Sequence, residues 1–86
     1  MKATRYYHRR VLHKRPYLRD EHVLQVLRSP LRREVQPDGR IRHWGAVEAY
    51  GGRILRVVTF EDGETVHNAF LDRGFRTDPR PEGAER

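Results

Sequence analysis

The feature that most constrains the fold is a series of turns marked by glycine in the second half of the chain. Three segments carry this signal: Gln36-Pro37-Asp38-Gly39, Gly51-Gly52 and Asp62-Gly63. Glycine supplies the positive φ that tight hairpin turns need. The runs between and after these turns are rich in Val, Ile, Phe, Thr and Trp and predict three strands: residues 40–50, 53–60 and 64–70. Short turns between consecutive strands predict an antiparallel meander.

A fourth strand is expected before Pro37, at residues 31–36. It would lie at the edge of the sheet, where an exposed backbone could pair with another chain. Its basic residues, Arg32 and Arg33, argue against indiscriminate pairing.

The first thirty residues predict two helices. Residues 5–15 suit a short helix that Pro16 brings to an end. A second helix begins near Asp20, a candidate N-cap, and ends at Ser29-Pro30. It carries an apolar stripe: Val23, Leu24, Val26 and Leu27. Helices segregated from strands indicate an α+β fold, with two N-terminal helices packed on one face of a four-stranded antiparallel meander.

The length and composition indicate one small domain. The chain has 86 residues, of which 36% are hydrophobic, so the core is small. We assign residues 1–76 to this domain and expect a disordered tail at residues 77–86, which hold prolines and a glycine and almost nothing apolar. The chain has no cysteine and no run of about 18 apolar residues, so neither disulfides nor a membrane span is expected. A cytoplasmic location is the default expectation.

Positive charge is concentrated in the first half of the sequence. The formal net charge is +6; residues 1–43 hold 12 basic and 4 acidic side chains, whereas the remainder holds 6 basic and 8 acidic ones. A basic half of this kind indicates a polyanionic or acidic partner, such as RNA, DNA or an acidic protein. The alternative is an arginine-rich surface that is merely solvated.

A two-residue turn at Gly51-Gly52 would pair Tyr50 with Arg53, and this register sorts the strand residues onto two faces. One face would be apolar and pack on the second helix: Trp44, Ala46, Leu55, Val57, Val66 and Phe70. The other face would gather three chemically active side chains: His43, Arg56 and His67. A slip by one residue would exchange the faces of a strand.

Such a face could cleave RNA without a metal ion. His67 could serve as general acid or base, and Arg56 could hold the phosphate. His43 could be a second proton carrier, or could stack with Phe60 on a splayed base. Structural roles are the alternative: an arginine paired with a carboxylate, and a histidine satisfied by a backbone carbonyl. No metal-ligand spacing, phosphate loop or cofactor motif is present, so no metal or cofactor is expected.

Five short motifs follow one another in order between residues 5 and 76: Arg15-Pro16-Tyr17, Val26-Leu27-Arg28-Ser29-Pro30, Asp38-Gly39-Arg40-Ile41-Arg42-His43-Trp44-Gly45, Arg53-Ile54-Leu55-Arg56-Val57-Val58, and Asp62-Gly63-Glu64-Thr65-Val66-His67-Asn68-Ala69-Phe70-Leu71-Asp72-Arg73. In this order they resemble small bacterial domains grouped with the RelE-like toxin superfamily. The resemblance implies two N-terminal helices on a small antiparallel sheet. It also implies an endonuclease that acts on free or ribosome-bound mRNA without metal, and an antitoxin partner that neutralises it.

The resemblance places candidate catalytic residues in or just after the later strands. Arg56 matches a strand arginine of that superfamily, and His67 and Arg73 lie where such enzymes often carry functional groups. The chain departs from the pattern near its C-terminus, where Phe70 and Phe75 stand in a region that often holds Tyr or His. Binding without catalysis is therefore the alternative.

In that alternative, a non-enzymatic module binds nucleic acid or an acidic protein through its basic residues. The candidates for RNA contact are mostly in the first helix: Arg9, Arg10, Lys14, Arg15 and, in the sheet, Arg42. A third reading is a structural protein with no nucleic-acid role, whose binding would not depend on salt.

Overall fold

The computed structural model of the protein describes residues 1–75. The first helix, residues 5–14, contains η1 (Tyr7–Val11), with π-type hydrogen bonds, and continues as α1 (Leu12–Lys14). The other elements are a helix, a short 3-10 turn and four strands: α2 (Asp20–Arg28), η2 (Glu48–Tyr50), β1 (Arg32–Val35), β2 (Ile41–Val47), β3 (Arg53–Thr59) and β4 (Val66–Leu71). The strands form one antiparallel sheet in the order β1-β2-β3-β4. The expected α+β fold with N-terminal helices and a meander sheet is confirmed; the expected tail at residues 77–86 lies outside the described residues.

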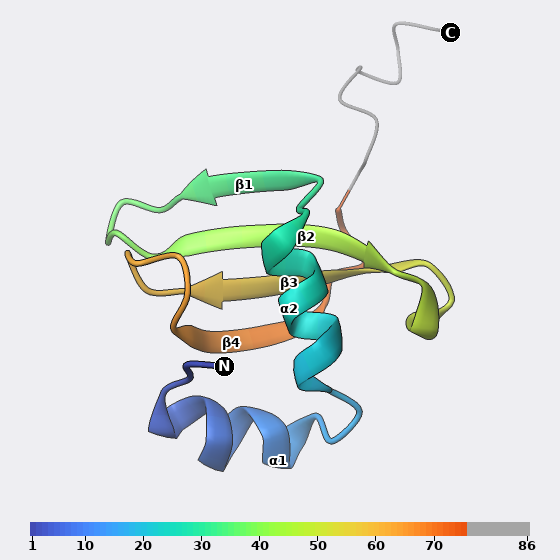
Figure 1. Ribbon diagram of the computed structural model, residues 1–86, viewed down its shortest axis with the longest axis horizontal. Helices are drawn as coiled ribbons and strands as arrows, with labels where there is room; N and C mark the ends of the chain where they lie inside the picture. Colours follow the sequence, from blue (N-terminus) through green and yellow to red (C-terminus); the bar gives the residue numbers. More distant parts are fainter. Residues whose placement is uncertain (76–86) are drawn as a thin grey trace, which may run out of the picture.

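The two helices take different positions against the sheet. Helix α2 crosses one face, whereas the first helix lies beside β4, at the edge of the sheet (Figure 1). The residues before the first helix also pair with β4: Thr4 N donates to Val66 O, and Val66 N donates to Lys2 O, both at 2.9 Å. The N-terminal segment therefore covers the start of the β4 edge and leaves β1 as the uncovered edge.

The core lies between α2, the first helix and one face of the sheet. Its buried members come from both helices and from three strands: Tyr7, Val11, Val23, Val26, Val47, Leu55, Val57, Val66 and Ala69. Gly45 of β2 lies directly under α2, since a Cβ at this position would come within 3.1 Å of Val26 Cγ2. A side chain on Gly45 would therefore push α2 away from the sheet.

The turn between β2 and β3 is longer than the sequence led us to expect. Gly51 and Gly52 have φ of 72° and 80°, but η2 adds three residues to the turn, and Val47 pairs with Arg53. The expected pairing of Tyr50 with Arg53 is wrong by three residues. Because three is an odd number, β2 presents to each face the residues that we had assigned to the other.

This shift exchanges two prominent side chains. Trp44 pairs with Arg56, and Arg56 pairs with Phe70, so these three lie together on the face away from α2. His43 pairs with Val57 and lies on the core face. The expectation that Trp44 and Phe70 pack under α2 is therefore wrong, and so is the expectation that His43 lies on the same face as Arg56 and His67.

Candidate nucleic-acid interface

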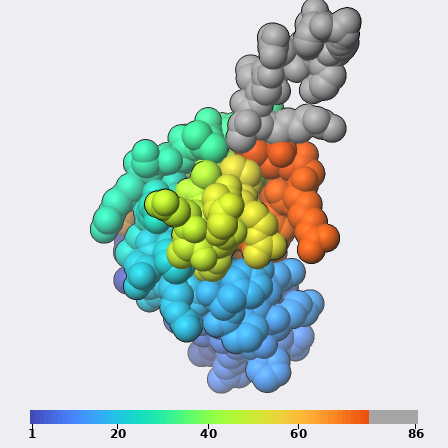
Figure 2. Space-filling model, turned by 90° about the vertical axis from the view of Figure 1, so that its right-hand side faces the viewer, coloured from blue at the N-terminus to red at the C-terminus, as the bar shows by residue number. Residues whose placement is uncertain are grey.

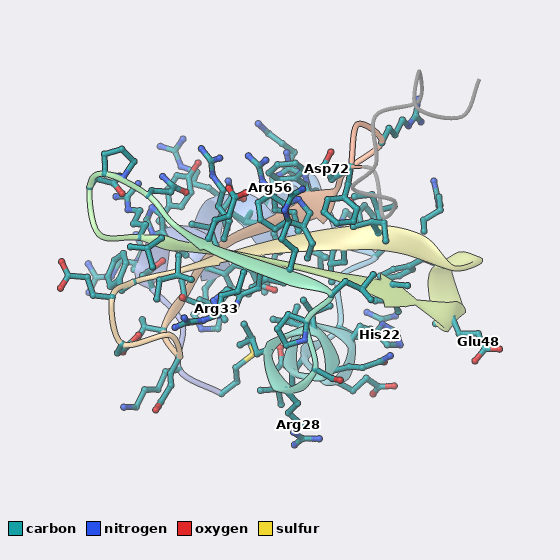
Figure 3. All side chains as sticks on the ribbon, turned by 90° about the horizontal axis from the view of Figure 1, so that it is seen from above. His22, Arg28, Arg33, Glu48, Arg56 and Asp72 are labelled. Atoms are coloured by element: carbon teal, nitrogen blue, oxygen red, sulfur yellow. The ribbon has the colours of Figure 1, made fainter. Side chains whose placement is uncertain are left out.

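We call the sheet face opposite α2 the open face. In Figure 3, α2 lies below the sheet, and Arg56 and Asp72 rise above it. The register places alternate residues of all four strands on this face: Arg32, Glu34, Arg42, Trp44, Ala46, Ile54, Arg56, Val58, Asn68 and Phe70. No helix within residues 1–75 crosses it. The open face is therefore the broad surface that is left for a ligand, except around Trp44, which is 4% exposed and has Phe75 stacked on it at 5.5 Å.

The centre of the open face is a cluster built around Asp72. Trp44 Nε1 donates to Asp72 Oδ2 at 2.9 Å, and Arg56 Nη1 lies 3.5 Å from the same oxygen. Asp72 Oδ1 accepts from Gly74 N at 2.9 Å. The Arg56 guanidinium lies 4.7 Å from the Phe70 ring centroid and 5.7 Å from that of Trp44. The guanidinium of Arg56 is thus already held by one carboxylate and two aromatic rings. These contacts favour a structural role for Arg56 over a role as a phosphate-binding residue.

Three further arginines lie over aromatic rings of the same face. Arg15 reaches Phe70 from the end of the first helix at 5.6 Å, and Arg40 lies 5.9 Å from the Phe60 centroid. Arg32 covers Trp44 and Phe75 at 5.6 and 5.4 Å. A guanidinium laid on a ring is partly desolvated and fixed in orientation, and its outer surface remains a flat, positively charged platform.

Carboxylates neutralise only part of this charge. Arg32 Nε lies 3.4 Å from Glu34 Oε2, and Arg42 Nη1 lies 3.9 Å from Glu34 Oε1. Arg15 and Arg40 have no ion pair within residues 1–75. Within residues 1–75, the open face therefore keeps two guanidinium groups without a carboxylate partner, Arg15 beside the first helix and Arg40 after the β1–β2 turn.

His67 lies near Arg40, at the end of the open face next to the β3–β4 turn. A β-bulge between Val58 and Thr59 shifts the pairing with β4, and the His67 ring stacks on Tyr6 at 4.8 Å and lies 5.2 Å from the Phe60 centroid. Its Nδ1 is 3.1 Å from Thr4 Oγ1. Burial, and secondarily the Arg40 charge, lower the pKa of His67. His67 thus lies on the basic face, as the sequence led us to expect.

His43 lies on the opposite face and is removed from any ligand. Its side chain is 2% exposed, and Nε2 is 3.0 Å from Thr59 Oγ1. Burial, helped by the Arg33 charge, lowers the pKa of His43 to about 4. A proton carrier must reach its substrate, so the candidate catalytic role of His43 is wrong.

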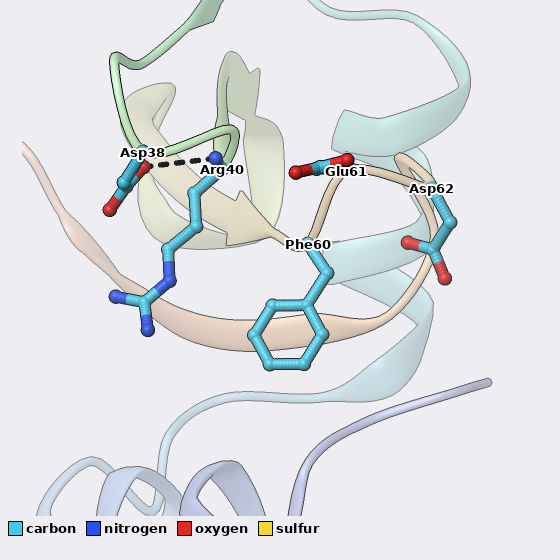
Figure 4. A pocket seen from close by; sticks show the side chains of 5 residues that line it. All are labelled: Asp38, Arg40, Phe60, Glu61 and Asp62. Carbon is cyan, nitrogen blue, oxygen red and sulfur yellow. Dashed lines mark hydrogen bonds between the residues drawn. The ribbon is translucent and has the colours of Figure 1, made fainter.

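The hollow next to His67 is shown in Figure 4. It has a volume of about 380 Å³ and is lined by Asp38, Arg40, Phe60, Glu61 and Asp62. Asp62 is occupied by the β3–β4 turn, because it accepts hydrogen bonds from the backbone of Glu64 and Thr65 and from the Thr65 hydroxyl. These bonds, led by the one from the hydroxyl, lower the pKa of Asp62 to about 2. Arg40 is the one cationic side chain among the five lining residues, and it stands beside three carboxylates: Asp38, Glu61 and Asp62.

Arg73 lies at the other end of β4. It lines a separate hollow of about 450 Å³ with Tyr17, Tyr50, Arg53 and Leu71. Figure 2 faces this end of the molecule, where the yellow-green β2–β3 turn meets the light blue loop before α2 and the orange end of β4. Six residue steps of a strand separate Arg73 from His67, roughly 20 Å. The structure therefore does not bring these two candidate residues together.

Arg9, Arg10 and Lys14 of the first helix are exposed, and Arg15, which follows the helix, is partly buried. Arg10, Lys14 and Arg15 line a hollow of about 340 Å³ together with Tyr6, Val11 and His13. Arg9 is also exposed but does not line it. Of these four basic residues, Arg15 contacts an aromatic ring of the open face, that of Phe70. The basic first helix and the open face therefore meet at Arg15.

Sequence reasoning missed the aromatic side chains that support the arginines, and it missed Asp72. The sequence does carry a signal, because arginine and aromatic residues fall on the same face of each predicted strand: Arg40, Arg42 and Trp44 in one, and Arg56 and Phe60 in the next. It could be interpreted only with the correct register, because the register decides which arginine meets which ring.

Comparison with known proteins gives no matching family profile, no matching curated protein and no matching solved structure. The resemblance to RelE-like toxins is therefore an expectation that these comparisons do not test. Within residues 1–75, no helix has the length and apolar character needed to cross a membrane. In the same part of the chain, no three His, Asp or Glu side chains are grouped as metal ligands.

Proposed function

We propose that this chain is a small RNA-binding protein of the toxin type, which holds single-stranded RNA across its open face. The observation that carries the proposal is the set of four guanidinium groups laid on aromatic rings there: Arg15, Arg32, Arg40 and Arg56. Unstacked bases bind to aromatic and guanidinium planes, and phosphates bind to unpaired arginines. Arg15 and Arg40 supply the phosphate contacts in this proposal.

Binding is tested with a fluorescein-labelled single-stranded RNA of about ten nucleotides, followed by anisotropy over a series of salt concentrations. Changing Arg15→Gln together with Arg40→Gln removes the two unpaired cations. We expect weaker binding and a salt slope that is less steep by about 1.4, since each phosphate contact on a single strand contributes about 0.7. The matched control is Arg28→Gln, an exposed arginine of α2 on the other side of the sheet (Figure 3).

The outcome separates the proposal from its alternatives. An equal loss of RNA affinity in Arg28→Gln and in the double variant would argue against the open face as the RNA site. Binding that does not respond to salt would argue against phosphate contacts altogether. A loss of RNA affinity when Arg9 and Arg10 are changed, while Arg15 and Arg40 are kept, would favour the non-enzymatic basic module that binds through the first helix.

A second candidate function, metal-independent cleavage of RNA, rests on His67 and Arg40. The Thr4 hydroxyl accepts from Tyr7 N at 3.0 Å and still has a lone pair and a proton to offer His67 Nδ1. Either ring tautomer is thus supported, and Nε2 has no partner within residues 1–75. A neutral imidazole at this place can take the 2′-hydroxyl proton as the 2′-oxygen bonds to phosphorus and the bond from phosphorus to the 5′-oxygen breaks. The imidazolium then returns that proton to the departing 5′-oxygen, while Arg40 stabilises the phosphoryl charge.

Cleavage is tested in cells by inducing the wild-type chain and His67→Gln, and by following growth and new mRNA ends by primer extension. Growth arrest with new ends, both lost in His67→Gln while its RNA affinity is unchanged, would support cleavage. Arrest without new ends would support binding alone, with the ribosome or free mRNA as the target. In both cases the same basic face is where an acidic antitoxin would compete with RNA.

A further inference from the structure

We propose that two copies of this chain pair through β1, antiparallel, so that their sheets join into one sheet of eight strands. The four residues of β1 are all exposed, and the apolar side chains Leu31 and Val35 are 58% and 66% exposed. The opposite edge of the sheet is covered by the N-terminal segment and the first helix. β1 is therefore the one edge within residues 1–75 that can accept a further strand.

The alternation of backbone groups decides which residues of β1 face outward. Gln36 N donates to Arg40 O at 2.7 Å, which makes this the first hydrogen-bonded pair beyond the turn. Partners along β1 and β2 keep the same register, so the N–H and C=O groups of Glu34 and Arg32 also point to β2. Those of Arg33 and Val35 point away from the sheet and are available to a second copy.

Three antiparallel registers use these outward groups, and their charges differ. Placing Val35 opposite itself sets Arg33 against Pro37, which has no N–H to donate. Placing Arg33 opposite Val35 sets the two Glu34 carboxylates against each other. Placing Arg33 opposite itself sets each Arg32 opposite the partner's Glu34, and each Leu31 opposite the partner's Val35. Leu31 N already donates to Trp44 O at 2.7 Å, so the Leu31–Val35 pair contributes its apolar side chains and the Leu31 carbonyl, but no Leu31 N–H. Only this last register pairs unlike charges and apolar side chains.

In this register, the remaining charged side chains of β1 either point away from the interface between the two β1 strands or have a partner of opposite charge. Arg33 extends under its own sheet, because its Nη2 lies 3.6 Å from where a Cβ on Gly63 would be. The two Arg33 guanidinium groups therefore point away from the two-fold axis. On the open face, Arg32 already pairs with Glu34 of its own chain at 3.4 Å. In the dimer, Arg32 and Glu34 of both copies form a ring of four charges of alternating sign. A strand with a different charge pattern would not complete this ring, so the ring favours a second copy of this chain as the partner.

The chain has no cysteine, so a single introduced cysteine reports the register without ambiguity. Two residues in a hydrogen-bonded antiparallel pair have Cα atoms about 5.5 Å apart, within the range of a disulfide. We expect Arg33→Cys to form a covalent dimer under mild oxidation. In the same register the two Val35 residues lie four positions apart along the strands, so Val35→Cys, which is equally exposed, is the control and is expected to stay uncrosslinked.

Charge exchange supplies the second test, with mass measured by light scattering after size exclusion and with circular dichroism to confirm folding. Arg32→Glu alone and Glu34→Arg alone are expected to be monomeric, because each sets like charges opposite one another. The double variant restores the pairing and is expected to be a dimer. A wild type that stays monomeric at the highest attainable concentration would overturn the dimer. Faster crosslinking of Val35→Cys than of Arg33→Cys would overturn the register, and neither result depends on RNA binding.

Discussion

The buried His43 is expected to make the fold sensitive to mild acid. Its ring is 2% exposed, its Nε2 is bonded to Thr59, and its Nδ1 is buried without a hydrogen-bond partner within residues 1–75. Burial, and then the Arg33 charge, lower the pKa of His43 from 6.5 to about 4 in the folded chain. In the unfolded chain the ordinary pKa of about 6.5 returns.

The sign and the magnitude follow from these two pKa values. The unfolded chain binds the proton more tightly, so the contribution of neutral His43 is fully present above pH 6.5 and is lost as the pH falls towards 4. The free energy of unfolding should drop by about 2 kcal/mol between about pH 7 and pH 5, and by about 3 kcal/mol by about pH 4. Asp62, with its pKa of about 2, loses its contribution only below this window.

Urea unfolding at several pH values, followed by the fluorescence of the buried Trp44, measures this loss. The variant His43→Leu with Thr59→Val removes the titrating ring and its hydroxyl partner together, so that no polar group is left unpaired. Its stability should fall clearly less than that of the wild type over the same pH range, and the loss that remains is the part contributed by His67. His67→Gln is the matched control, because His67 also has a lowered pKa and acts in the same direction. If the double variant loses as much stability in acid as the wild type, the reasoning is refuted.

Three further outcomes are expected. Asp72→Asn should destabilise the fold by about 2 kcal/mol in urea unfolding, because the indole of Trp44 would donate to a neutral amide oxygen and Arg56 would lose its ion-pair partner. Gly45→Ala should cost about 1 to 3 kcal/mol, and Val26→Ala in the same chain should recover part of that loss, since the new methyl group would meet Val26 at 3.1 Å. Arg40→Gln should raise the pKa of His67 in an NMR titration, because Arg40 contributes to lowering it; an unchanged pKa would contradict their proximity.

Much of the fold could be predicted from local sequence. Glycine at the turns leaves a clear signal, and Gly39, Gly51, Gly52 and Gly63 all have positive φ. The apolar stripe of α2 is also visible in the sequence, and two of its members, Val23 and Val26, are buried in the structure. These features depend on residues close together in the chain, which is why a single sequence reveals them.

The register between β2 and β3 could not be predicted in the same way. Whether Glu48–Tyr50 continues the strand or forms η2 depends on tertiary contacts, such as that of Tyr50 with the Tyr17 carbonyl at 3.0 Å. Gly45 carried a usable clue, since a residue without a side chain fits a strand crossed closely by a helix.

The candidate site was predicted in part. His67 was assigned to the basic face by a register that differs from the observed one only at the bulge before Thr59. His43 was assigned to the wrong face by the larger shift at η2. The pairing of Arg56 with Asp72 joins residues sixteen positions apart whose meeting depends on both strands, so neither residue alone could indicate it.

The contact between the N-terminal segment and β4 has a consequence for how the protein is made. Thr4 and His67 are 63 positions apart, yet their side chains meet at 3.1 Å. During synthesis, the first helix emerges from the ribosome long before β4, and the Tyr7 and Val11 side chains lack part of the core that covers them until the last strand arrives. The fold can therefore be completed only after β4 has left the ribosome, and a tag fused to Met1 would have to be accommodated beside β4 when Lys2 and Thr4 pair with Val66.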